Sequence, residues 1–234
     1  MVRDLGRRRP IVCLVTDRRR LCHGCDAARA RQCVVEQVRQ AVAAGVDLLS
    51  VRERDLDGAP LAALVAEAVE IARGTTTRVT VNDRLDVAIA AGAAGVHLRA
   101  DSMPVAAARR IAPEGFLIGR SVHAPDEAAA NGDADYLIAG TVFASVSKPG
   151  VESLGETGLA AIVRASRVPV LAIGGVTLET MPQIAAAGAA GFAAIGLFVL
   201  RLVALAQDGP CRAIPLRPVV DAARARFDSV KTAS

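Results

Sequence analysis

An amide and a carboxylate, Asn82 and Asp83, stand directly after a short apolar run in the middle of the chain. Residues 79–81 are Val-Thr-Val, a β-branched run that predicts a buried strand. Arg84 and an apolar pattern of helical period follow the pair. Polar groups between a strand and a helix lie where α/β proteins bind and transform ligands. The same two residues could instead cap the following helix, and the pair alone does not decide between these interpretations.

Polar or small residues also follow the other predicted strands. In a barrel of parallel strands all these positions reach one face, so their side chains converge. Scattered polar residues would instead be spread over both ends of the barrel. The convergence therefore predicts one binding site. Its candidate residues, in chain order, are Arg52, Arg54, Asn82, Asp83, Asp101, Ser121, His123, Ser145, Ser147, Lys148, Gly174, Gly175 and Gly196.

The charged candidates fall into two chemical groups. Asp83 and Asp101 offer carboxylate oxygens, which suit Mg²⁺ together with substrate phosphate oxygens and water. Arg52, Arg54 and Lys148 are cations that suit a diphosphate. Two carboxylates beside three cations predict a metal-bound diphosphate.

The glycine candidates predict a second phosphate site. Residues 174–175 and Gly196 follow the last two strands, where barrels often bind phosphate through backbone N–H groups. Other interpretations stay open: residues 52–54 could be a solvated charge run, and residues 174–175 only a turn. His123 could simply pack near the cavity mouth, and His97 is expected to be a hydrogen-bonded interior residue.

Eight strand-and-helix units must position these residues. Several units repeat an Ala-rich helix, a glycine and a short apolar strand, which predicts a single-domain (β/α)8 TIM barrel in the α/β class. A doubly wound open sheet is the alternative, but the first strand lacks a GxGxxG turn. We expect a loosely ordered terminus at 1–10, the barrel at 11–206 and an extension at 207–234 with a helix at 219–227. The expected strands are 11–16, 46–51, 79–81, 95–98, 116–119, 136–139, 168–173 and 191–195.

Composition limits the classes of function. The chain has 234 residues, of which 52% are hydrophobic and 3% aromatic, with no Trp. Few aromatics and a net charge of +4 argue against nucleic-acid binding and favour phosphorylated small molecules as partners. No run reaches the length of a membrane span and no signal peptide is evident, so we expect no membrane partner and a cytoplasmic location. The sequence leaves the oligomeric state open, a homo-oligomer included.

The five cysteines do not indicate a disulfide scaffold. Cys22 and Cys25 enclose His23 and Gly24, but a metal knuckle needs a second ligand pair, and Cys33 alone is weak support. We expect free thiols at these positions, and a loop at residues 18–26.

Seven short motifs in this order resemble the thiamine phosphate synthase / TenI family over about residues 11–198. They are Val-Arg-Glu-Arg at 51–54, Val-Asn-Asp-Arg-Leu-Asp-Val-Ala at 81–88, Gly-Val-His-Leu at 95–98, Gly-Arg-Ser-Val-His at 119–123, Ala-Asp-Tyr-Leu-Ile-Ala-Gly at 134–140, Ser-Val-Ser-Lys at 145–148 and Ala-Ile-Gly-Gly-Val at 172–176. The family is a (β/α)8 barrel whose synthase joins hydroxymethylpyrimidine diphosphate to thiazole phosphate, giving thiamine phosphate and diphosphate.

The resemblance implies a role for each candidate residue. Asp83 and Asp101 would hold Mg²⁺, the cofactor. Lys148 would help the diphosphate leave, and Ser121 would lie beside the pyrimidine. The residues that would bind substrate are Ser50, Arg52, Arg54 and Asn82 for the diphosphate half, Ser145 and Ser147 near the thiazole, and Gly175, Ile195 and Gly196 for the thiazole phosphate.

Departures from the family pattern leave three hypotheses. Ser50, Arg99 and Gly196 stand where the synthase usually has Gln, Gly and Ser. TenI-type members act as thiazole tautomerases, with a histidine placed like His123 as proton carrier. A tautomerase needs no metal, so the retained Asn-Asp pair and later aspartate favour a Mg²⁺-dependent synthase. The third hypothesis is a non-catalytic barrel that binds phosphorylated thiamine precursors.

Overall fold

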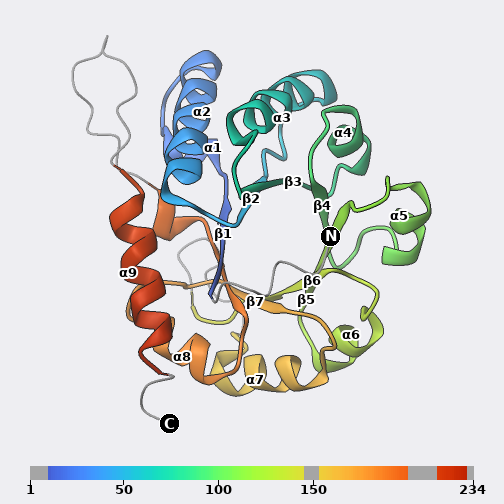
Figure 1. Ribbon diagram of the computed structural model, residues 1–234, viewed down its shortest axis with the longest axis vertical. Helices are drawn as coiled ribbons and strands as arrows, with labels where there is room; N and C mark the ends of the chain where they lie inside the picture. Colours follow the sequence, from blue (N-terminus) through green and yellow to red (C-terminus); the bar gives the residue numbers. More distant parts are fainter. Residues whose placement is uncertain (1–9, 145–152, 200–214, 231–234) are drawn as a thin grey trace.

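The chain folds into a closed barrel of eight parallel strands, as a computed structural model of residues 10–144, 153–199 and 215–230 shows. Figure 1 looks down the barrel, with the strands as an inner ring and the helices as an outer ring. The predicted (β/α)8 TIM barrel is therefore confirmed. The strands are β1 (Ile11–Val15), β2 (Leu48–Val51), β3 (Arg78–Asn82), β4 (Gly95–Leu98), β5 (Leu117–Val122), β6 (Tyr136–Gly140), β7 (Val170–Ile173) and β8 (Gly191–Ala194).

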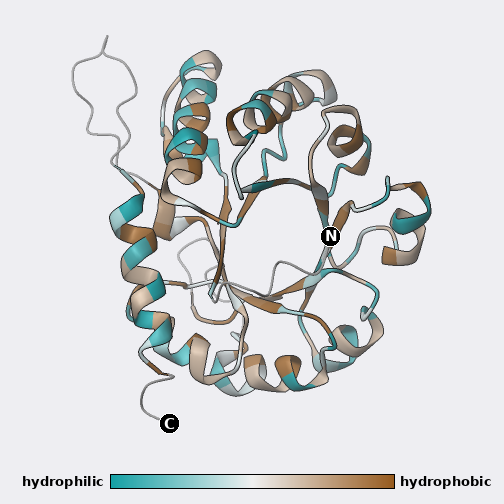
Figure 2. Cartoon of the chain, in the orientation of Figure 1, coloured by the Kyte–Doolittle hydropathy of each residue, from teal (hydrophilic) through white to brown (hydrophobic). Residues whose placement is uncertain are grey.

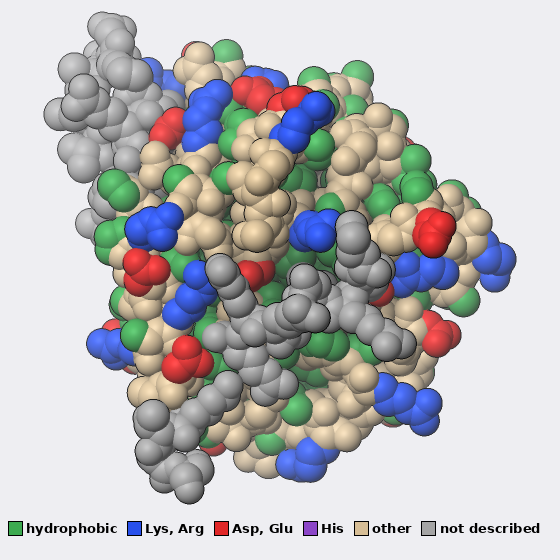
Figure 3. Space-filling view, in the orientation of Figure 1, with side chains coloured by type: hydrophobic (Ala, Val, Ile, Leu, Met, Phe, Trp, Pro, Cys, Tyr) green, Lys and Arg blue, Asp and Glu red, His purple; other side chains and the backbone are tan. Residues whose placement is uncertain are grey.

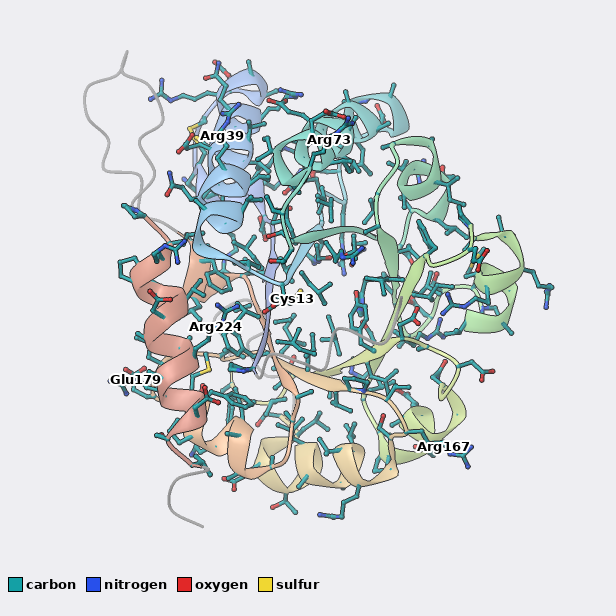
Figure 4. The ribbon with its side chains drawn as sticks, in the orientation of Figure 1. Cys13, Arg39, Arg73, Arg167, Glu179 and Arg224 are labelled. Atoms are coloured by element: carbon teal, nitrogen blue, oxygen red, sulfur yellow. A yellow bond between two sulfur atoms is a disulfide. The ribbon has the colours of Figure 1, made fainter. Side chains whose placement is uncertain are left out.

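The strands alternate between two apolar layers. On β1 the side chains of Ile11, Cys13 and Val15 face the barrel interior, and those of Val12 and Leu14 pack against the helices. Figure 4 shows Cys13 inside the ring of strands. β1 pairs with both β2 and β8, which closes the ring. Closure brings all the carboxyl ends of the strands to one face.

The helices cover the outer face of the barrel. In Figure 2 most hydrophilic residues lie on helices and loops, whereas the strands are mainly apolar. The helices are α1 (Arg18–Leu21), α2 (Ala27–Ala44), α3 (Gly58–Ala72), α4 (Leu85–Ala90), α5 (Val105–Ile111), α6 (Pro125–Ala130), α7 (Gly155–Ala165), α8 (Met181–Ala186), the short 3₁₀ helix η2 (Gly196–Phe198) and α9 (Arg217–Asp228).

The last helix, α9, packs against the barrel. Val220, Ala223 and Phe227 are buried on its inner side. The Arg224 guanidinium, labelled in Figure 4, donates to the Gly45 carbonyl (2.7 Å) and to Asp47 Oδ2 (3.1 Å), and so ties α9 to the turn before β2. Within the described residues β8 is followed only by the short helix η2, and residues 1–9 and 200–214 lie outside them.

Two glycines serve different structural purposes in the barrel. Gly45 ends α2 with φ +73°, a left-handed conformation that glycine adopts without a Cβ penalty. Gly119 lies on β5 under the ring of Tyr136, and a Cβ there would stand 2.2 Å from the ring. The first glycine therefore serves a turn, and the second makes room for a large side chain inside the barrel.

The segment between β1 and α2 differs from the expectation. Residues 18–21 form helix α1 rather than a loop, because Asp17 accepts from the Arg20 backbone N–H and caps the turn. Cys22 and Cys25 are joined in a disulfide, with Cα atoms 5.6 Å apart, so the expectation of free thiols there is wrong. The disulfide connects the end of α1 to the segment before α2.

Figure 3 shows one face of the molecule, on which Lys and Arg side chains are scattered among acidic ones. No helix in the described ranges, 10–144, 153–199 and 215–230, is long and apolar enough to cross a membrane.

Candidate functional site

A cavity of about 810 Å³ opens at the carboxyl ends of the strands. Its volume is within the usual range for small-molecule sites. Ten residues proposed from the sequence line it: Ser50, Arg52, Arg54, Asn82, Ser121, His123, Gly174, Gly175, Ile195 and Gly196. Ser145, Ser147 and Lys148 lie outside the described residues. Asp83 and Asp101 do not line the cavity. Both contact Arg99, which does line it.

A buried carboxylate organises the loop that carries Arg52 and Arg54. Glu53 is only 5% exposed, and Thr16 Oγ1 donates to its Oε1 (2.6 Å). The Arg52 backbone N–H in turn donates to Thr16 Oγ1 (3.0 Å). Burial raises the pKa of Glu53, although hydrogen bonds from Thr16 and Arg18 oppose this. Glu53 is therefore a fixed buried carboxylate at the corner between β1 and β2, whereas Arg52 beside it is half-buried and Arg54 is exposed.

The cation at this corner lacks full compensation. The Arg52 side chain is 26% exposed, and its nearest carboxylate is Asp17, with Nη1 and Oδ2 3.9 Å apart. Burial lowers the pKa of Arg52, and repulsion from Arg54 lowers it further. An anion placed here would relieve that repulsion, so this end of the cavity suits a diphosphate.

The Asn82-Asp83 pair does not cap the next helix. The N-cap of α4 is Arg84, and no side chain caps that helix. Asp83 has φ +64°, the left-handed region that few non-glycine residues adopt, and its N–H donates to the His97 carbonyl (2.9 Å). Backbone strain of this kind is concentrated at functional sites. Asp83 is thus held in an unusual backbone conformation directly after Asn82, which ends β3 and lines the cavity.

Two carboxylates converge on one guanidinium beside this strand end. Arg99 Nη1 lies 3.6 Å from Asp83 Oδ2, and Arg99 Nη2 is paired with Asp101 Oδ2. The pairing with Arg99 lowers the pKa of Asp101. Within the described residues no three His, Cys, Asp or Glu side chains gather as a metal site. Two carboxylates around one cation still fit Mg²⁺, which takes its other ligands from phosphate and water.

Ser121 forms a hydrogen-bonded pair with His97. Sequence reasoning placed Ser121 after a strand, but it lies on β5, and its Oγ is 2.9 Å from His97 Nε2. Burial lowers the pKa of His97 to about 4, so the ring is neutral at pH 7. His97 Nδ1 has no hydrogen-bond partner among the described residues. Because a buried N–H without a partner is costlier than a bare acceptor, Nε2 carries the proton, and the Ser121 hydroxyl can donate into the cavity.

His123 faces the cavity from the loop after β5. Its Nδ1 is hydrogen-bonded to the Gly140 carbonyl, and its backbone N–H donates to Glu127 Oε2 (2.7 Å). A carbonyl oxygen only accepts, so Nδ1 carries the proton of the neutral ring and Nε2 is left as an acceptor. The hydrogen bond to Gly140 holds the ring at the cavity wall, and a role as proton carrier stays a prediction.

The opposite end of the cavity is built from backbone. Gly174 and Gly175 follow β7 with φ +97° and +62°. A Cβ on Gly175 would stand 2.6 Å from the Ala144 carbonyl oxygen. Gly196 opens η2, and the atom nearest to a Cβ there is Arg20 Nη2 at 3.5 Å. Uncovered backbone beside a single guanidinium suits a phosphate group.

Polar and charged cavity residues that sequence reasoning did not propose include Asp17, Arg20, Arg99, Thr141, Thr177 and Glu179. Arg20 belongs to a basic run that the sequence displays but does not place. Arg99 was noticed only as a departure from a pattern. The signal that could have found both is their position shortly after a strand, the same criterion that selected the others.

Comparison with known proteins identifies the family. The family model described as thiamine monophosphate synthase (TMP-TENI) matches residues 12–198. The chain belongs to this family. A thiamine-phosphate synthase of Methanoculleus marisnigri is 44% identical over 165 residues, which are 69% of this chain and 78% of that protein. One of Methanoregula boonei is 41% identical over 178 residues, 74% of this chain and 82% of that protein.

A solved structure agrees with this membership of the thiamine monophosphate synthase family. The thiamine phosphate pyrophosphorylase of Pyrococcus furiosus superposes with a TM-score of 0.73 at 28% sequence identity. The match covers 94% of this chain and 96% of that one. The resemblance drawn from the seven motifs is therefore confirmed at the level of the family and the fold.

Proposed function

We propose that this chain is a thiamine-phosphate synthase, which joins hydroxymethylpyrimidine diphosphate to thiazole phosphate and releases diphosphate. The observation that carries the proposal is the division of one cavity of about 810 Å³ into two ends of different chemistry. One end gathers arginines, and the other exposes glycine backbone. Relatives named thiamine-phosphate synthase at 41–44% identity support the same conclusion.

The arginine end binds the diphosphate and stabilises it as it leaves. Arg52 and Arg54 face the leaving oxygens, with Asn82 as a neutral donor beside them. Asp83 and Asp101 would hold Mg²⁺, which when bound would neutralise charge on the diphosphate oxygens. The C–O bond to the diphosphate breaks, and its electron pair leaves with the diphosphate. Fixed cations that meet charge as it develops lower the barrier to this step.

The glycine end holds the second substrate in line. Gly175 and the Ile195-Gly196 backbone bind the thiazole phosphate, with Arg20 as the nearby cation. The Ser121 hydroxyl donates to the pyrimidine. The thiazole nitrogen then forms the new bond to the pyrimidine methylene carbon. Anchoring both substrates at opposite ends of one cavity converts their meeting into an intramolecular step. Lys148, Ser145 and Ser147 keep their proposed roles beside the diphosphate and the thiazole.

Turnover with both substrates tests the proposal. The protein is mixed with hydroxymethylpyrimidine diphosphate and thiazole phosphate, with Mg²⁺ or with EDTA, and thiamine phosphate and diphosphate are measured. We expect the two products in equal amounts with Mg²⁺ and none with EDTA. No product in the presence of Mg²⁺ would exclude synthase activity, and equal rates with EDTA would exclude the metal.

A thiazole tautomerase is the second candidate, and the orientation of His123 favours it. Its Nε2 is an acceptor on the cavity wall, as proton transfer on the thiazole requires. The test supplies the thiazole phosphate tautomer alone to the wild type and to His123→Gln. A proton carrier predicts a rate loss of about 10²-fold or more in His123→Gln. Equal rates would remove His123 from this role.

Three expectations complete the proposal. We expect the reaction to take place in the cytoplasm, with small phosphorylated substrates as the partners. A homo-oligomer stays a prediction, and light scattering of the protein in solution measures the oligomeric state. If neither reaction proceeds but the phosphorylated precursors raise the melting temperature, the protein is a non-catalytic binder.

A further inference from the structure

Arg99 occupies the position between the two carboxylates proposed to bind metal. Its Nη1 faces Asp83 Oδ2 at 3.6 Å, and its Nη2 is paired with Asp101 Oδ2. Its backbone N–H lies 3.4 Å from the other oxygen of Asp83. One side chain thus contacts both carboxylates, and the contacts to Asp83 are longer than an optimal charge-assisted hydrogen bond.

This arrangement makes Arg99 and a metal ion alternatives. A divalent cation held by Asp83 and Asp101 needs oxygens that Arg99 now engages. A guanidinium and Mg²⁺ on the same carboxylates would also repel each other, since like charges at contact distance are strongly unfavourable outside bulk water. Arg99 must therefore leave the carboxylates before both can bind a metal ion.

The side chain has an anion site within reach when it leaves. Arg99 lines the cavity together with Arg52 and Arg54. Burial and the charge of Arg54 lower the pKa of Arg52, and the charge of Arg99 adds a smaller contribution in the same direction. Its side chain is 42% exposed, so neighbouring side chains do not enclose it. A diphosphate in the arginine end would offer oxygens to replace both carboxylates.

We propose that Arg99 holds Asp83 and Asp101 in the metal-free protein and transfers to the diphosphate when Mg²⁺ enters. Arg99 is then a metal competitor in the free protein and a diphosphate ligand in the complex. This inference rests on the synthase proposal and deepens it. It gives a role to a residue that departs from the family pattern.

Calorimetric titration of the full chain tests the exchange without turnover. The probes are Mg²⁺ alone and inorganic diphosphate alone, and the variant is Arg99→Gln. We expect Arg99→Gln to bind Mg²⁺ about tenfold more tightly than the wild type, because the competitor is gone. We expect it to bind diphosphate about tenfold more weakly, because one cation is lost.

Two further variants distinguish the effect of the Arg99 contacts with two carboxylates from the effect of its positive charge. Arg84→Gln removes the same charge from a neighbouring pair, Arg84 with Asp86, which does not line the cavity. We expect less than a twofold change in both affinities for this control. Arg99→Lys keeps the charge but cannot span two carboxylates, so it should retain diphosphate binding and gain part of the Mg²⁺ affinity.

The outcomes are distinct. Mg²⁺ affinity within twofold of wild type in Arg99→Gln overturns the competition, whether or not the protein is a synthase. Equal changes of Mg²⁺ affinity in Arg84→Gln and Arg99→Gln also overturn the competition, because net charge alone would then explain the effect. No Mg²⁺ binding by any variant overturns the metal site itself, and turnover in EDTA would then show that the synthase proposal stands without it.

Discussion

The two ends of the cavity differ in the groups that they present to a ligand. At the ends of β2, β3 and β4 the groups facing a ligand are side chains, above all Arg52, Arg54 and Arg99. At the ends of β7 and β8 they are largely backbone, exposed by Gly175 and Gly196. The arginine end can exchange its partners, as the Arg99 bridge suggests. The glycine end depends, at Gly175, on a left-handed backbone shape that most side chains would disturb. Substitutions should therefore damage chemistry at one end and structure at the other.

The largest effect is expected at the arginine end. Asp83→Asn removes a carboxylate but keeps a residue that tolerates the left-handed backbone at φ +64°, so the fold should be retained. Asp83→Ala would add backbone strain to the loss of charge. We expect Mg²⁺-dependent kcat to fall by about 10³-fold or more, because the metal would lose one of two protein ligands. Steady-state kinetics and the melting temperature measure the two effects.

Asp86→Asn is the matched control for Asp83→Asn. Asp86 pairs with Arg84 at the surface and is 66% exposed on its side chain. The kcat of Asp86→Asn should stay near the wild-type value. Undiminished turnover in Asp83→Asn would remove Asp83 from the metal site.

The second prediction concerns the support beneath the arginine end. Burial lowers the pKa of His97 to about 4 in the folded chain, partly opposed by Asp83, against about 6.5 when exposed. Below pH 6.5 the unfolded chain binds a proton that the folded chain does not, so the free energy of unfolding falls as pH falls. Between pH 6.5 and 4 this loss is about 3 kcal/mol, and above pH 6.5 His97 contributes no slope.

Urea unfolding of wild type and His97→Gln at several pH values measures this slope. Glutamine is neutral throughout, so the difference between the two proteins should shrink as pH falls to 4. A constant difference would show that His97 is protonated alike in both states.

The third prediction concerns the backbone of the glycine end. Gly175→Ala places a Cβ 2.6 Å from the Ala144 carbonyl oxygen and the Phe143 Cβ, on a residue with φ +62°. We expect a loss of about 2 kcal/mol in the free energy of unfolding, together with a higher KM for thiazole phosphate. The KM for the pyrimidine substrate should change less. Equal increases in both KM values would show that the two ends are not independent.

The smallest effect is expected at Gly196, the glycine after β8 at the same end of the cavity. Gly196 lies outside the left-handed region, and its Cβ would meet only the flexible end of Arg20, at 3.5 Å. Gly196→Ala should therefore change the free energy of unfolding by less than about 0.5 kcal/mol. Chemical unfolding of Gly175→Ala and Gly196→Ala measures both losses. The comparison shows whether the backbone conformation, rather than the added methyl group, determines the loss of stability at the glycine end. A loss like that of Gly175→Ala would contradict this explanation.

The sequence by itself determined the barrel and part of the cavity wall. Helical and strand periods, with glycines between them, are local properties, so eight units could be counted without coordinates. Parallel strands then place their carboxyl ends together, and this rule alone selected Arg52, Asn82 and Ser121. Boundaries were less certain: β5 continues to Val122, so Ser121 lies on the strand. The cap at Asp17 turned a predicted loop into α1.

Only the tertiary structure decided which of these groups touch. Thr16 meets Glu53, and His97 meets Ser121, because strand register brings together residues far apart in the chain. The Arg99 bridge to Asp83 likewise depends on the pairing of β3 with β4. Register is set by the closure of the whole barrel, which no local window of sequence contains. The sequence thus named several of the charged groups, and the closed barrel determined their partners.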